Sequence, residues 1–273
     1  RMTTDSLNLS DTRTWLPLDG LAPGFDAAKA EPTDDLAGRT VTTVDERGEQ
    51  TAYRFDAETV AWERATESGR DAVEVIEVDE ELYYAQYTPA AHPEQAVTVI
   101  LDLRSGHALT VVSILGEAAP GRTAVQMRFV PATIAGIDVR GEAPAPTEEL
   151  IGRRVLWVYS TVHAYEHVYL SPHWYSWHCL AGPEQGLADT DENTVWRVRP
   201  GIYVFTWREK VIPCGSVTIA DHRDQKALRA HGVLFGTDES GSGATHFTFG
   251  AHGRLLSNTV HPVEYDPARP LER

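Results

Sequence analysis

The chain of 273 residues carries 24 Lys and Arg against 40 Asp and Glu, a net charge of −16 at neutral pH. This balance argues against nucleic acid or an anionic membrane surface as a partner, because both require a positive footprint. A hydrophobic content of 42% is ordinary for a globular protein and excludes wholesale disorder. The sequence has no apolar run of roughly 18 residues, so we expect no membrane-spanning helix. With only Cys179 and Cys214 available, a cytoplasmic chain with two reduced thiols is the simpler interpretation.

The first 35 residues form an irregular lead-in with little periodicity, and we expect Trp15, Leu16 and Leu18 to hold it against the surface of the fold. From Leu36 onward, short segments of β-branched and aromatic residues alternate with Gly, Pro and Ser turns, as at 97–103 and 202–207. Helical periodicity is weak throughout. The pattern predicts an all-β protein, either a sandwich or a barrel.

The sequence repeats itself in order. Leu36–Val41 is echoed by Leu150–Val155, and four further segments recur with an offset that grows from about 114 to about 120 residues. A Pro-rich stretch at 141–149 lies where a linker belongs. The repeat therefore predicts two tandem antiparallel β-barrels, with domain bounds of 1–35 for the lead-in, 36–140 for the first barrel, 141–149 for the linker and 150–273 for the second barrel.

The two halves differ in chemistry. Residues 1–149 hold 27 acidic and 12 basic residues, a net charge of −15, whereas residues 150–273 hold 13 and 12, a net charge of −1. The second half also holds nine of the 11 histidines and five of the seven tryptophans. This concentration of aromatic and imidazole groups predicts a cavity with a polar lining in the second barrel.

Side chains in the second half alternate in a way that assigns them to one face of each strand. His163, Tyr165, His167 and Tyr169 are two residues apart, so on a strand they project together. The residues expected inside the barrel are Trp157, Tyr159, His163, Tyr165, His167, Tyr175, Trp177, Trp207 and Glu209. Each buried polar group without a partner costs roughly 1–3 kcal/mol, so a network, water or a ligand must satisfy this interior. An aromatic pocket with convergent polar groups is typical of a small-molecule site.

Other interpretations stay open at this point. The lumen could be a filled polar core, and a reversed phase would turn the same row outward. His163 and His167 are roughly 13 Å apart along a strand, too far to chelate one ion together, so no metal site is predicted. Asp189 and Asp191, with Glu192, are interpreted as an acidic loop cluster rather than a calcium loop. Either Arg197 or Arg199 could be a carboxylate clamp, and the favoured interpretation of each is a solvated strand residue.

The chain resembles the molybdenum cofactor biosynthesis F (MoaF) family. The segments that carry the resemblance are Arg154–Tyr169, Trp177–Leu180, Gly186–Asp191 and Trp207–Val211. The resemblance implies tandem lipocalin-like (calycin) barrels with little helix, which agrees with the internal repeat. It implies no particular biochemical activity.

The second half is also faintly similar to the phenolic acid decarboxylases, single lipocalin-like barrels that need no cofactor. In that resemblance Tyr159 and Tyr165 match pocket tyrosines, and Glu209 matches the catalytic, proton-handling glutamate. Trp157 replaces the second of two paired tyrosines, and Gly186–Ala188 offers no counterpart to the substrate-binding arginine.

We therefore expect a cofactor-independent lyase, isomerase or cyclase for a small aromatic or conjugated substrate. The expected catalytic residues are Glu209, Tyr159, Tyr165, His163 and His167. The expected substrate-binding residues are Trp157, Tyr169, Tyr175, Trp177, Trp207 and Tyr203. A small-molecule carrier without catalysis and a structural or interaction protein with a filled lumen are the alternatives, and association into a homodimer is left open.

Overall fold

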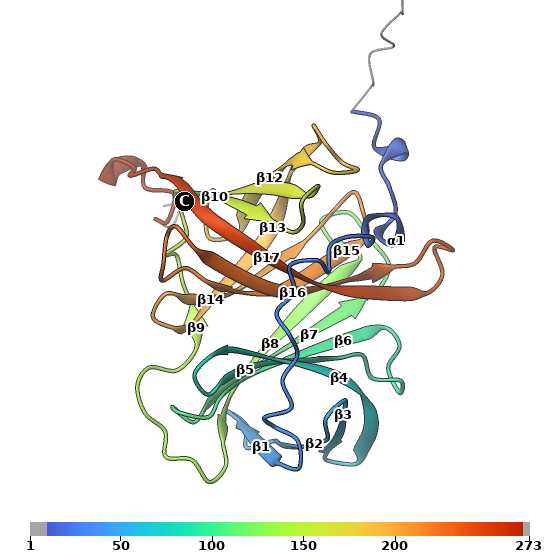
Figure 1. Ribbon diagram of the computed structural model, residues 1–273, viewed down its shortest axis with the longest axis vertical. Coiled ribbons are helices and arrows are strands. Elements are labelled where there is room, and N and C mark those ends of the chain that lie inside the picture. The colour runs from blue at the N-terminus through green and yellow to red at the C-terminus, as the bar shows by residue number, and fades with distance from the viewer. Residues whose placement is uncertain (1–9, 270–273) are drawn as a thin grey trace, which may run out of the picture.

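The computed structural model of the chain describes residues 10–269 and consists of two closed antiparallel barrels, which confirms the predicted fold (Figure 1). In the first barrel each strand pairs with the next, and β1 pairs with β8 to close the ring. Its strands are β1 Thr40–Asp45, β2 Gln50–Phe55, β3 Thr59–Arg64, β4 Glu67–Asp79, β5 Leu82–Tyr87, β6 Gln95–Asp102, β7 His107–Leu115 and β8 Val125–Ile134.

The second barrel repeats this order and is closed by pairing of β12 with β13 and of β10 with β17. Its strands are β10 Arg153–Val158, β11 Ala164–Tyr169, β12 Trp174–Ala181, β13 Ala188–Arg199, β14 Ile202–Arg208, β15 Cys214–Asp221, β16 Leu228–Thr237 and β17 Ala244–Asn258. A two-residue strand between the barrels, β9 (Ala145–Pro146), adds to β13. A short 3₁₀ turn, Val263–Tyr265, follows the last strand.

The N-terminal segment belongs structurally to the second barrel. It contains a 3₁₀ turn, Thr12–Thr14, and one helical turn, α1 (Leu18–Leu21), and it runs from the far end of the second barrel down to the first (Figure 1). Leu18, Leu21 and Phe25 are buried in the same core cluster as the second lumen. The helical turn directs its apolar side chains toward the barrel, so Leu18 packs against the fold and is only 1% exposed.

The barrels pack side by side through the outer faces of their strands. Leu82, Ile100 and Leu109 of the first barrel and Val204 and Val217 of the second form one apolar cluster. The Tyr84 hydroxyl donates to the Val217 carbonyl at 2.7 Å, which satisfies its only donor inside that contact. The two barrels therefore share a core of their own, separate from either lumen.

An ion-paired arginine spans the same contact. Arg199 donates from Nε and Nη2 to both oxygens of Asp102, at 2.9 and 2.8 Å, and from Nη1 to Asp79 at 2.8 Å. The prediction that Arg199 is a solvated strand residue is wrong, since β13 carries it to the junction and leaves its side chain 7% exposed. Two-point pairing with Asp102 holds the charge where water is largely excluded.

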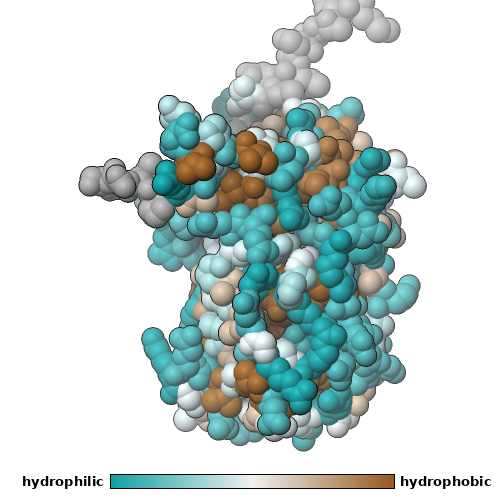
Figure 2. Space-filling view, turned by 90° about the vertical axis from the view of Figure 1, so that its left-hand side faces the viewer, coloured by the Kyte–Doolittle hydropathy of each residue, from teal (hydrophilic) through white to brown (hydrophobic). Residues whose placement is uncertain are grey.

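The surface seen in Figure 2 is mainly hydrophilic over the first barrel, and hydrophobic groups gather toward the upper end, over the second barrel. This matches the uneven charge of the two halves. Within residues 10–269, no helix is long and apolar enough to cross a membrane.

Candidate functional site

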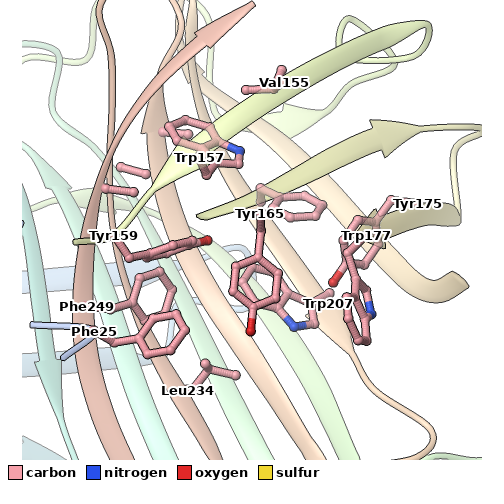
Figure 3. Packing of buried hydrophobic residues seen from close by; sticks show 14 of the residues in the cluster. Phe25, Val155, Trp157, Tyr159, Tyr165, Tyr175, Trp177, Trp207, Leu234 and Phe249 are labelled. Atoms are coloured by element: carbon pink, nitrogen blue, oxygen red, sulfur yellow. The ribbon is translucent and has the colours of Figure 1, made fainter. Parts of the chain in front are cut away.

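A cavity lies in the second lumen at the end formed by the β10–β11, β12–β13, β14–β15 and β16–β17 turns. Seven of the residues predicted from alternation line it: Tyr159, Tyr165, His167, Tyr175, Trp177, Trp207 and Glu209. Figure 3 shows Tyr159 on one side of this space and Trp177 on the other, with Tyr165 and Trp207 between them. Six further residues line the cavity that the sequence did not predict: Leu21, Phe25, Glu184, Leu234, Phe247 and Phe249.

Glu209 follows the end of β14 and is the central acid of the cavity. Its Oε2 accepts from the Trp207 indole at 3.2 Å and from the Cys214 thiol at 2.9 Å. Burial, reinforced by the charges of Asp191 and Glu184, raises the pKa of Glu209 to about 8. A carboxyl group with that pKa is largely protonated at neutral pH and able to donate a proton.

Asp191 is the second acid, and its position corrects the sequence interpretation. It lies on β13 rather than in a solvated loop, and it is 1% exposed. Its Oδ2 accepts from the Trp177 indole at 2.9 Å and its Oδ1 from the Lys210 amide at 3.1 Å. Burial raises its pKa above the ordinary value. Asp191 thus fixes the ring of Trp177 in the cavity wall and adds negative field at Glu209.

Tyr165 and Glu184 form a second polar pair. The Tyr165 hydroxyl donates to Glu184 Oε1 at 2.6 Å, while Glu184 Oε2 is buried and makes no hydrogen bond within residues 10–269. Burial raises the pKa of both groups. Glu184 sits in the β12–β13 connection, where no strand periodicity signals that it points inward.

His167 is neutral in this setting. Its ring lies within 5.2–5.8 Å of Tyr175, Phe205 and Trp207, and burial lowers its pKa to about 3. Its Nδ1 is buried without a hydrogen-bond partner in the described part of the chain. A neutral imidazole with an open nitrogen is ready to accept or donate one hydrogen bond to a ligand.

The N-terminal segment closes the mouth of this lumen. The ring of Phe25 lies 5.0 Å from that of Tyr159, 4.6 Å from His163 and 6.0 Å from Tyr165 and Phe247. Figure 3 shows Phe25 beside Phe249 and below Tyr159. The cavity that is left measures about 50 Å³. That volume holds a few waters, whereas a benzene ring needs a cavity of roughly 150 Å³.

Four of the predicted site residues do not line the cavity. Trp157 and Tyr203 lie near the other end of the barrel, where each packs edge-on against His222. Tyr169 is buried beside Phe205. His163 is at the mouth, where its Nδ1 lies 2.7 Å from the Ser160 hydroxyl and Phe25 covers its ring. The alternation in sequence predicts that all four side chains point inward. It carries no information about the position of each one along the barrel axis.

The side chains that line the cavity are suited to proton transfer. No group of three or more His, Cys, Asp or Glu within residues 10–269 is arranged to hold a metal ion. The cavity instead brings together a protonated carboxyl, a neutral imidazole and phenols. The hydroxyls of Tyr159 and Tyr175 make no hydrogen bond to any described residue, so they are open to a ligand oxygen.

Two closed antiparallel barrels in one chain, one with an aromatic lumen that holds buried acids, define a tandem β-barrel protein. Residues 13–117 match the MoaF N-terminal domain and residues 144–259 match the MoaF C-terminal domain. The chain belongs to the MoaF family.

Two individual proteins are also similar. Protein MoaF of Klebsiella aerogenes is 39% identical over 153 residues, which span 54% of this chain and 56% of that protein. The crystal structure of a putative beta-lactamase from Burkholderia vietnamiensis covers 39% of this chain and 95% of its own, at 17% identity and a TM-score of 0.32. A structural likeness this low carries no argument about fold or function.

Proposed function

We propose that the second barrel is a cofactor-independent acid–base catalyst, a lyase, isomerase or cyclase, for a small aromatic or conjugated substrate such as a phenol. The observation that carries the proposal is Glu209, a carboxyl group with a pKa of about 8 that faces a cavity of aromatic rings. A general acid works best when its pKa is close to the operating pH. The buried, unpaired cysteines Cys179 and Cys214 fit the cytoplasmic location we propose for it.

The roles follow from which groups are free. Trp177 and Trp207 would stack on a conjugated ring, and their indole N–H groups are already fixed by Asp191 and Glu209. The hydroxyls of Tyr159 and Tyr175 would hold the substrate oxygen and stabilise charge that develops on it. Glu209 would give its proton to the substrate, and the resulting carboxylate would accept a proton from the same substrate later in the reaction.

Entry of a ring requires the Phe25 segment to move, because the closed cavity of about 50 Å³ is too small. Phe25 is held among rings that would equally accept a substrate ring, so the two compete for one place. The same closure favours the alternative function, a carrier that encloses its ligand without changing it.

The test uses Glu209→Gln, which keeps the size and hydrogen bonds of the protonated acid but cannot transfer a proton. Conjugated acids and phenols are incubated with the protein while tryptophan fluorescence and product formation are followed together. The variant should bind but lose turnover, whereas Glu239→Gln, in an exposed loop, should behave as wild type. Full turnover by Glu209→Gln would overturn the proposed role. Quenching without product in the wild type would support the carrier.

A further inference from the structure

The N-terminal segment closes one end of the second barrel. The corresponding end of the first barrel is open. A cavity of about 650 Å³ opens there, between the β1–β2 turn at residues 46–49 and the β3–β4 turn at residues 65–66. No residue of the described N-terminal segment lines it. Small-molecule sites in proteins occupy roughly 300–1,000 Å³, so this lumen has the size that the second one lacks.

The floor of this cavity is aromatic and uncharged. Tyr53 of β2 is buried, and its ring lies 6.5 Å from that of Tyr87 on β5. Thr51 and Thr110 line the wall above it. Burial raises the pKa of Tyr53, so its hydroxyl stays neutral and presents a dipole rather than a charge. A flat conjugated ring would find stacking surface and hydroxyl groups here.

Two arginines face the same lumen, one from each of the strands that flank the β1–β2 pair in the barrel, β3 and β8. On β3, Arg64 is two residues beyond the buried Trp62 and so shares its inward face. On β8, Arg128 pairs with the buried Val112 of β7, and paired residues project to the same side of a sheet. The topology therefore turns both guanidinium groups toward the space above Tyr53.

Four acids also line this cavity, Asp45, Glu46, Glu49 and Glu67, and three of them have partners in hydrogen bonds or ion pairs. Asp45 Oδ1 accepts from the backbone amides of Arg47 and Glu49, which shapes the β1–β2 turn. Glu67 is bonded to His92 and lies 3.4 Å from Arg64.

The carboxylate of Glu49 is 3.6 Å from Arg64. Arg128 is different, because within residues 10–269 no carboxylate lies within 4.0 Å of its guanidinium. Arg128 is exposed at the mouth, on the inward face of β8. Without a counter-charge, its guanidinium is available for an oxyanion carried by a ligand.

We propose that the first barrel is a second ligand site, which takes a small amphipathic organic anion. Its conjugated ring lies on Tyr53 at the floor, and its carboxylate is bound at the mouth by Arg128. The proposal depends on no chemistry at Glu209, which belongs to the other lumen.

The experiment measures binding of cinnamate by isothermal titration to the full chain, with cinnamyl alcohol as the uncharged probe of equal length. Arg128→Gln should raise the Kd for cinnamate about tenfold, since a charge-assisted hydrogen bond is lost. Arg54→Gln removes the same charge from β2 of the same barrel, but Arg54 alternates with Tyr53 and is exposed, so its Kd should not change. The alcohol should bind about tenfold more weakly than the carboxylate.

Crystals soaked in cinnamate locate the ligand. Density above Tyr53 with the carboxylate at Arg128 is the expected result. Density only in the second lumen, equal affinity of Arg128→Gln and wild type, or equal affinity for the alcohol would overturn the proposal and leave the role of Glu209 untouched. Absence of cinnamate binding to the wild type would overturn it too.

Discussion

The ring of Phe25 lies 5.0 Å from the ring of Tyr159, so the N-terminal segment supplies part of the lumen of a barrel whose first strand begins at Arg153. The contact joins the segment that precedes the first barrel to the lumen of the second barrel. It also sets the size of the candidate site, because Phe25 occupies space that a ligand ring would need.

Phe25→Ala should open the second lumen. The change removes a ring that is 5% exposed, so we expect a loss of roughly 3–5 kcal/mol in the free energy of unfolding and tighter binding of conjugated phenols. Urea unfolding and quenching of tryptophan fluorescence measure the two effects.

The matched control is Leu18→Ala. Leu18 is buried in the same segment but does not line the cavity. It should cost a similar free energy, roughly 2–5 kcal/mol, without improving the affinity. If both variants bind phenols equally well, general loosening of the segment explains the gain and Phe25 is not a plug.

The stability of the protein should depend on pH through Glu209. Its pKa is raised from the ordinary value of 4.5 to about 8 in the folded state, so the folded state holds a proton that the unfolded state releases first. The contribution is therefore fully present below about pH 4.5 and is lost as the pH rises through about 8. Urea midpoints of wild type and Glu209→Gln should diverge over this window, the variant losing less stability as the pH rises. Parallel curves would count against a buried protonated acid.

Glu74 should give the free energy of unfolding a pH dependence of the opposite sign. Lys29 Nζ donates to its Oε2 at 2.6 Å and His231 Nε2 lies 3.0 Å from its Oε1, and these partners hold its pKa at about 2 despite burial. Its contribution is present above about pH 4.5 and is lost as the pH falls through about 2. Glu74→Gln should therefore lower the free energy of unfolding by about 2–3 kcal/mol at neutral pH, with the deficit shrinking in acid. A constant deficit from neutral pH down to about pH 2 would show that lost packing, not charge, is responsible.

The junction between the barrels should depend on Arg199. Arg199→Met leaves Asp102 buried without its two-point partner, and breaking such a pair typically costs roughly 3–5 kcal/mol. Arg223→Gln is the control, because Arg223 also contacts Asp79 but its side chain is 47% exposed. Such exposed pairs contribute about 0–1 kcal/mol. Equal losses in thermal unfolding of the two variants would contradict the assignment.

Alternation in the sequence was sufficient to predict much of the second lumen. A period of two depends only on the pleat, and it correctly turned Tyr165, His167, Tyr175 and Trp177 inward. It could not place Glu184, which lies in a connection, or Phe25, whose contacts join distant parts of the chain. The predicted loop position of Asp191 is wrong for a related reason, since its acidic neighbours resemble a loop although β13 carries it into the core.

The larger cavity of the first barrel could not be predicted from the sequence either. The acidic composition of residues 1–149 suggested a solvated half, and the pocket at Arg128 depends on the summed volumes of side chains and on barrel closure. Neither quantity is encoded in local periodicity. By contrast, the internal repeat predicted two barrels because corresponding strands keep their order.

The state of Glu209 is the central claim, and an NMR titration of protein labelled with ¹³C at the glutamate carboxyl carbons tests it most directly, with Glu209→Gln identifying the signal. A carboxyl resonance that titrates near pH 8 is the expected result. A midpoint near the ordinary value of 4.5 would show that Glu209 is ionised at neutral pH and would contradict its role as a proton donor.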